Sequence, residues 1–123
     1  MKFARSIVAE ARIVILKVDG ELGDQDLLSL ADALEQDPEV AADFSLLIDL
    51  SEADGREVTS SGVRALAARA LVLSPASRRA VVVPSALGFG MARMYELLSE
   101  RRGGAARVFR NNSEALRWLE FGV

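Results

Sequence analysis

Three hydroxyl side chains, Thr59, Ser60 and Ser61, stand directly before Gly62 and a run of apolar residues at helical spacing. A hydroxyl at the start of a helix acts as a cap, because its oxygen accepts a hydrogen bond from an unpaired N–H group of the first turn. The same N–H groups and the positive end of the helix dipole also favour a phosphate on a serine of the first turn. The stretch therefore has two open roles: a cap at Thr59 or Ser60, and a phosphorylation switch at one of the serines.

Charged residues flank these hydroxyl groups. Arg56 and Arg64 are close enough in sequence to pair with a phosphate on a serine of the first turn, and together with the three hydroxyl residues they form a candidate surface for a protein partner. The same segment carries three carboxylates, Glu52, Asp54 and Glu57. Their charge would repel a phosphate, so the net electrostatic effect stays open at this point.

The residue types that support most enzyme and metal chemistry are missing. The chain has neither cysteine nor histidine, so it lacks the usual ligands of zinc, copper and haem and any Ser-His-Asp arrangement. Asp49 ends an apolar run near Glu52 and Asp54, and such carboxylates suit Mg²⁺. The paired aspartates of metal-dependent phosphoryl transfer are absent, because the sequence reads Asp49-Leu50-Ser51. We interpret these carboxylates as solvated loop charges and expect no enzyme, no cofactor and no metal.

A second candidate site lies in GFGMAR, which follows an apolar run and opens a helical pattern. It departs from a dinucleotide-binding fingerprint, because Arg93 replaces the third glycine and no acidic residue follows about 20 positions later. Gly88 and Gly90 would let the helix start pack closely against the sheet, a ligand or a partner. Phe89 is expected opposite the apolar stripe of the helix, either exposed to a partner or apolar ligand, or covered by a loop. These four residues form the alternative, ligand-binding candidate.

Size and charge limit the classes of function. A chain of 123 residues is long enough for a core of its own, and we expect a single domain over residues 1–123. The net charge of −3 argues against a nucleic-acid-binding protein, which would carry a clustered basic face. Residues 1–57 hold 14 acidic and 5 basic side chains, whereas residues 58–123 hold 4 and 10. This asymmetry marks either a partner surface or two halves that interleave in one fold.

The sequence shows no sign of membrane insertion or secretion. No apolar run approaches the roughly 18 residues that cross a bilayer, and charged residues interrupt the N-terminal segment. Because the chain has no cysteine, it can form no disulfide. We expect a bacterial-type cytoplasm as its location.

Apolar periodicity predicts alternating strands and helices. Strands are predicted over residues 3–8, 12–18, 44–50, 78–84 and 106–110. Helices are predicted from residue 24 to Pro38, from the TSSG stretch to about Leu73, over 86–102 and over 113–121. Parallel neighbours need crossovers of this length, so the order predicts an α/β domain. We expect a mixed, mostly parallel sheet of about five strands, antiparallel only at its N-terminal edge, with four helices.

The same patterns predict caps and inward-facing residues. Caps are expected at Ser85 and at Asn112 or Ser113, and Trp118 is expected to seal an edge. The inward-facing residues predicted for the four helices are Leu27, Leu30, Ala31 and Leu34; Val63, Leu66, Ala67 and Ala70; Leu87, Met91, Met94 and Leu98; and Leu116 and Leu119.

The segment LLIDLSEADGREVTSSGVRALAARAL resembles the central signature of STAS domains, the fold shared by anti-sigma factor antagonists and sulfate transporter tails. In that family a strand ending in Asp-Leu leads through a loop to Asp-Ser-Ser-Gly-Leu at a helix start. The closing VFRNNSEALRWL is similar to the family's last strand and helix. The resemblance implies a non-enzymatic module that docks on a protein such as an anti-sigma factor or kinase, with Ser60 as the phosphorylated serine. The family's Asp before that serine is Thr59 here, so the serine lacks the carboxylate that precedes it in the family.

The segment VVVPSALGFGMARMYELL is similar to the divergent SpoIIAA-like branch, whose fold resembles lipid-binding CRAL-TRIO domains. That likeness supports the alternative function, a carrier or sensor of a small apolar ligand held between the Phe89 helix and the sheet. A homodimer is also open, because Ala65, Ala68 and Val72 form a small outer face on the preceding helix.

Overall fold

The structure is a computed structural model that describes residues 1–69, 73–74, 77–83 and 86–123. Its strands are β1 (Lys2–Val8), β2 (Ile13–Gly23), β3 (Ser45–Glu57), β4 (Arg78–Val82) and β5 (Ala105–Phe109). Its helices are α1 (Asp24–Gln36), α2 (Ser60–Ala68), α3 (Ala86–Arg101) and α4 (Asn112–Phe121). The predicted α/β class and order of elements are confirmed.

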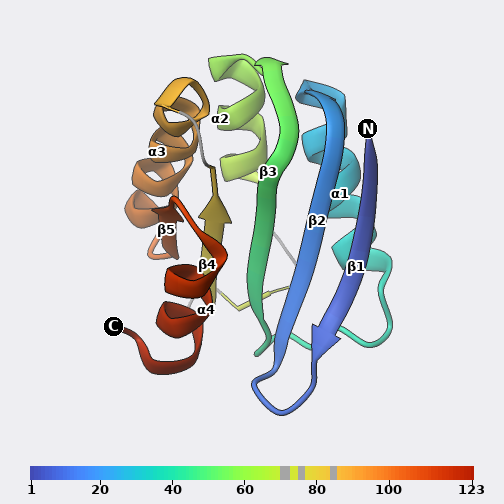
Figure 1. Cartoon of the computed structure of the whole chain (residues 1–123), viewed down its shortest axis with the longest axis vertical. Helices are drawn as coiled ribbons and strands as arrows, with labels where there is room; N and C mark the ends of the chain where they lie inside the picture. The colour runs from blue at the N-terminus through green and yellow to red at the C-terminus, as the bar shows by residue number, and fades with distance from the viewer. Residues whose placement is uncertain (70–72, 75–76, 84–85) are drawn as a thin grey trace.

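The strands form one sheet in the order β1-β2-β3-β4-β5. β1 is antiparallel to β2, and every other neighbouring pair is parallel, as predicted. Since each crossover moves one strand further in the same direction, crossovers of the usual right-handed kind bring their helices to one face. Figure 1 shows α1, α2 and α3 behind the sheet and α4 in front of it.

Side chains of the central strands alternate between two cores. On β2, Val14, Leu16 and Val18 belong to the core beneath α1, whereas Ile13 belongs to the core beneath α4. The α4 core also holds Trp118, whose ring centroid lies 5.6 Å from that of Phe109. Trp118 is thus buried in this core, and it packs against the edge strand β5 through Phe109.

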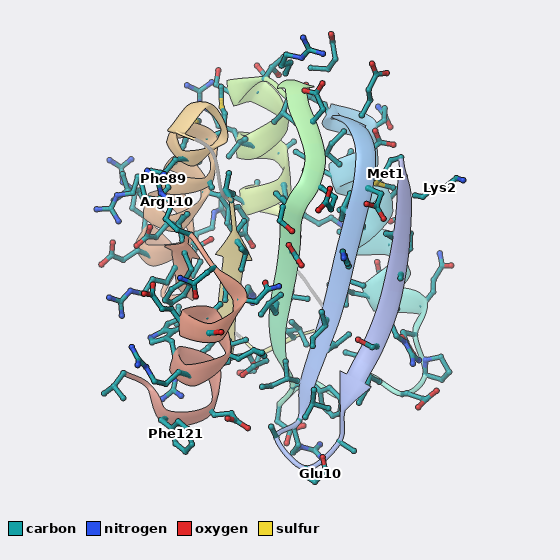
Figure 2. All side chains as sticks on the ribbon, viewed as in Figure 1. Met1, Lys2, Glu10, Phe89, Arg110 and Phe121 are labelled. Atoms are coloured by element: carbon teal, nitrogen blue, oxygen red, sulfur yellow. The ribbon has the colours of Figure 1, made fainter. Side chains whose placement is uncertain are left out.

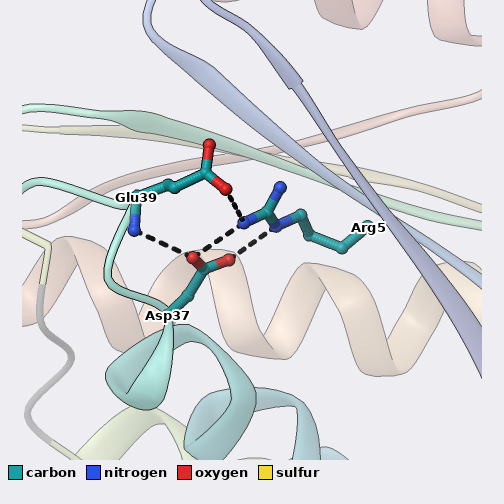
Figure 3. Close-up of polar contacts among 3 residues, drawn as sticks. All are labelled: Arg5, Asp37 and Glu39. Carbon is teal, nitrogen blue, oxygen red and sulfur yellow. Dashed lines mark hydrogen bonds and ion pairs between the residues drawn. The ribbon is translucent and has the colours of Figure 1, made fainter.

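α1 follows the prediction closely. Leu27, Leu30, Ala31 and Leu34 are all buried, and the helix ends two residues before Pro38. The chain beyond α1 holds the edge strand β1 in place, because the guanidinium of Arg5 donates to both carboxylate oxygens of Asp37, at 2.6 and 2.8 Å, and to Glu39 at 3.1 Å (Figure 3).

β3 is longer than predicted and continues to Glu57. Residues 51–57 were expected to be a loop of solvated charges, with Asp49 at the strand end, and this expectation is wrong. β2 also extends, so that Glu21 pairs with Asp54 in the parallel register. The pairing is missed because none of the residues 51–57 is fully buried, and charged side chains alternate there with Ser, Ala and Gly in a loop-like composition.

α2 is shorter than predicted, since it ends at Ala68 rather than near Leu73. Arg69 leaves the helix and reaches α1, where it donates to the Leu28 carbonyl, to Asp32 and to Glu35. These bonds hold the end of α2 against α1. Val63 is buried, and the remaining predicted residues Leu66 and Ala67 are half-buried, while Ala70 and Val72 lie outside the described residues.

The last two helices differ from the prediction by small rotations and shifts. On α3 the fully buried residues are Ala92, Tyr95 and Ser99, with the predicted Met91, Met94 and Leu98 half-buried beside them. Nothing is described for the Leu87 side chain or for Ser85. Asn111 caps α4 by accepting a hydrogen bond from the Glu114 N–H at 2.9 Å, one residue before the predicted Asn112. Of the predicted inward residues, Leu119 is buried and Leu116 half-buried.

Asp49 joins α4 to the sheet. Its carboxylate is buried and accepts hydrogen bonds from the Ser51 N–H and hydroxyl, at 3.0 and 2.5 Å, and from Asn112 Nδ2 at 3.0 Å. Burial acts to raise the pKa of Asp49, but these hydrogen bonds and the nearby charge of Lys17 outweigh it, so the pKa lies below its ordinary value.

We predict that Asp49→Asn lowers the free energy of unfolding by about 1.5 to 3 kcal/mol at pH 7, because an amide next to Asn112 leaves a charge-assisted hydrogen bond unmade. A lowered carboxyl pKa stabilises the fold above the unfolded pKa of about 3.9, and this gain is lost as the pH falls through the folded-state pKa. The difference between wild type and variant should therefore shrink in urea titrations below about pH 4.

The matched control is Asp43→Asn, which breaks an exposed ion pair with Arg12 and should change stability little. A difference at Asp49 that stays constant from neutral pH to the acid limit would contradict the carboxylate's role.

Candidate functional site

The tip of α2 is built by Thr59. Its side-chain oxygen accepts a hydrogen bond from the Gly62 N–H at 3.1 Å, so Thr59 is the helix cap. Thr59 in turn donates through its own N–H, at 2.8 Å, and its hydroxyl, at 2.6 Å, to the carboxylate of Asp24. Asp24 is the first residue of α1, so one carboxylate joins the N-terminal ends of two helices.

Gly62 makes this junction possible. A Cβ built at position 62 would collide with the carboxylate of Asp24, so only glycine leaves room for it. The hydroxyl and the N–H of Thr59 lower the pKa of Asp24 below its ordinary value, in that order of importance. A negative charge therefore already occupies the end of α2, where a phosphate on Ser60 would gain most from the helix dipole.

The other residues of the predicted partner surface lie around this junction without joining it. Ser60 is half-buried, and Ser61 and Arg64 are exposed. Within the described part of the chain, the three side chains make no hydrogen bond or ion pair with one another. Arg56 is exposed and held by Asp54, with Nε at 3.0 Å and Nη2 at 2.7 Å.

A cavity of about 340 Å³ lies between the sheet and the three helices on its rear face. Apolar side chains form nearly all of its wall. From the sheet they include Leu16, Leu46, Ile48, Leu50, Val81 and Val83; from α1, Leu27, Leu30, Ala31 and Leu34; from α2, Val63 and Leu66; and from α3, Met91 and Ala92. Tyr95 adds a phenol ring to this wall.

The polar part of the wall comes from the extension of β3. Ser51, Asp54, Gly55 and Arg56 line the cavity there. Because Gly55 and Arg56 are exposed, the cavity reaches the surface at this end, which we call the mouth. The hydrogen bond from Arg56 lowers the pKa of Asp54 below its ordinary value.

The four residues of the predicted ligand site have different positions. Gly88 lines the cavity, whereas Phe89, Gly90 and Arg93 are not among its lining residues. Phe89 is half-buried because the guanidinium of Arg110 covers its ring, 4.6 Å from the centroid, at one side of the molecule (Figure 2). Arg93 pairs with Glu96 on the same helix. A Cβ at Gly90 would meet no atom within 4 Å, so close packing does not explain this glycine.

A ligand was expected between the α3 helix and the sheet, but most residues of the cavity wall were not singled out, because they have the same apolar spacing as an ordinary core. The Asp24 contact was missed because it joins residues 35 positions apart. Within the described residues, no three or more carboxylates gather as a metal ion would require. No helix in those ranges is long and apolar enough to span a membrane.

Comparison with known proteins identifies the fold. No family model and no curated protein matches the chain. A crystal structure of an uncharacterised DUF3478-family protein from Shewanella loihica PV-4, which has a SpoIIAA-like fold, aligns with a TM-score of 0.62. The alignment covers 96% of this chain and 92% of that protein at 18% sequence identity. The fold is SpoIIAA-like. The architecture implied by the sequence resemblance is thereby confirmed.

We predict that Gly62→Ala lowers the free energy of unfolding by about 1 to 3 kcal/mol, because the added methyl group displaces the Asp24 carboxylate. In an Asp24→Ala background the same substitution should instead raise stability by about 0.5 to 1 kcal/mol, since alanine favours helix over glycine. Chemical denaturation of the four proteins gives the coupling between the two sites.

Gly90→Ala on α3 is the matched control, because its methyl group meets open space. It should be stabilising in both backgrounds. If Gly62→Ala lowers the free energy of unfolding equally in the wild-type and Asp24→Ala backgrounds, the carboxylate is not the reason that glycine is needed at position 62.

Proposed function

We propose that this chain is a non-enzymatic binding module that holds a small apolar molecule in the cavity between the sheet and α1, α2 and α3. The observation that carries the proposal is the volume of the cavity in so small a domain. Protein interiors are close-packed and contain few voids larger than a water molecule. A space of about 340 Å³ falls instead in the range of ligand sites, about 300 to 1,000 Å³.

The energetic cost of such a space supports the same proposal. At about 24 cal/mol per Å³, an empty apolar cavity of 340 Å³ would cost on the order of 8 kcal/mol, an upper bound because the mouth is open. A whole domain is stable by only about 5 to 15 kcal/mol. A ligand that fills the cavity would therefore recover an amount of free energy comparable with the whole folding stability of a domain.

The size of the cavity indicates the size of the ligand. At roughly 30 Å³ for each water-sized group, 340 Å³ accommodates about ten methylene groups. Linear molecules such as decanol are therefore suitable test ligands. The wall offers few polar partners away from the mouth, so burial of the ligand's hydrocarbon chain supplies the binding free energy.

We predict that Ala92→Phe fills the cavity. The variant should keep or gain thermal stability and should bind decanol at least about tenfold more weakly than wild type, since most of the buried chain is excluded. Calorimetric titration with decanol and thermal unfolding measure the two effects.

Ala115→Phe is the contrasting variant, because Ala115 is fully buried in the core beneath α4 and does not line the cavity. It should lose about 1 to 3 kcal/mol through overpacking. If Ala92→Phe destabilises as much as Ala115→Phe, or if decanol does not bind wild type, the cavity is not a ligand site.

A second candidate function is docking of a protein partner, in the manner of an anti-sigma factor antagonist, at the tip of α2. Two observations favour it: Ser61 and Arg64 are exposed, and Arg64 has no ion pair within the described residues. Thr59, Ser60 and Arg56 would complete the surface. The exposed Ala65 and Ala68 on the same helix would serve a homodimer.

If this surface is a switch, a partner kinase should label wild type and Ser61→Ala equally and should not label Ser60→Ala. Phosphopeptide mass spectrometry of the three proteins gives the site. Equal labelling of wild type and Ser60→Ala would remove Ser60 from the proposal, leaving Thr59 as a structural cap beside it.

A further inference from the structure

We infer that the ligand of the cavity is a linear apolar molecule with a cationic head group, such as an alkylammonium. The inference rests on the proposed ligand-binding function and adds the chemical class of the ligand. It depends on the side chains at the mouth and on the charges that neighbour them.

The mouth fixes the orientation of an amphipathic ligand. Away from the mouth the wall is apolar except for the Tyr95 ring, so a charged head group inside would lose its hydration without a counter-charge. The charged residues that line the cavity are Asp54 and Arg56, both on the extension of β3. A linear amphiphile therefore binds with its chain inside and its head group at the mouth.

Arg56, the cation that lines the mouth among the described residues, is not available to an anionic head group. Asp54 already accepts hydrogen bonds from Nε and Nη2 of Arg56, at 3.0 and 2.7 Å. A ligand carboxylate would have to displace Asp54 and leave that carboxylate without its partner. The Arg56–Asp54 pair thus contributes no net charge.

Two further carboxylates make the mouth negative. Glu21 lies opposite Asp54 in the register of β2 and β3, and both Glu21 and Glu57 act electrostatically on Arg56. Both are exposed, and neither makes an ion pair within the described ranges. The adjacent pair Asp19 and Glu52 places two more like charges side by side on the same extension. A cation at the mouth relieves this repulsion, whereas an anion adds to it.

The test compares decylamine, decanol and decanoate, which share one chain and differ in charge. By calorimetric titration at low ionic strength, decylamine should bind wild type about threefold to tenfold more tightly than decanol, and decanoate should bind most weakly. High salt should reduce these differences because the charges are exposed.

The double variant that combines Glu21→Gln and Glu57→Gln should bind decanol as tightly as wild type does. It should lose most of the preference for decylamine over decanol. The matched control is Glu10→Gln with Glu120→Gln, which removes the same charge elsewhere; Glu10 lies in the β1–β2 turn at the far end of the sheet (Figure 2). This control should keep the preference.

Decanoate binding as tightly as decylamine, or a preference that survives Glu21→Gln with Glu57→Gln, would overturn the cationic head group while leaving the cavity as an apolar ligand site. Failure of all three compounds to bind wild type would overturn the ligand-binding function itself. The two failures are therefore distinguishable.

Discussion

The direction in which the chain crosses the sheet is the constraint on which the rest of the structure depends. The parallel strands follow one another in space as they do in sequence, so right-handed crossovers give α1, α2 and α3 the same face. Three helices of different lengths must then cover that face together. α2 has nine residues and is about 13 Å long, whereas the 13 residues of β3 extend over roughly 40 Å. The cavity lies between the sheet and these three helices, and the short middle helix lines it with Val63 and Leu66.

Asp24 determines how α1 and α2 meet above this space. Its carboxylate accepts from Thr59 and lies where any residue larger than glycine at position 62 would collide with it. The STAS resemblance predicts a carboxylate immediately before Ser60, and this chain has Thr59 there instead. Asp24, the first residue of α1, places a carboxylate at the same N-terminal end of α2. The contact between the two helices therefore explains Thr59 and Gly62, whereas Ser60 and Ser61 do not join it.

The elements with strong local patterns could be predicted from the sequence, and those without such patterns could not. α1 was predicted to its buried residues because Leu27, Leu30, Ala31 and Leu34 form a regular stripe and Pro38 gives a clear end. The extension of β3 was not predicted, since its residues alternate charge with small side chains and resemble a loop. Neither the contact of Asp24 with Thr59 nor the hydrogen bond of Asn112 to Asp49 has a local signal, because each joins residues from distant parts of the chain. The cavity has none either, because the absence of packing atoms leaves no trace in apolar spacing.

The uneven distribution of charge along the chain has a structural consequence at the mouth. Arg5, Arg12 and Arg56 pair with acids of their own half, and Arg69 is the one base of residues 58–123 that pairs with an acid of the first half within the described residues. Ion pairs between residues 1–57 and residues 58–123 therefore neutralise little of the excess acidic charge of the first half. The mouth is formed by β3 with β2 beside it, and both belong to the acid-rich half. In the proposed function, an approaching ligand would meet a negative field set by sequence position and strand order together, and the apolar wall behind the mouth would select for the hydrocarbon chain of the ligand.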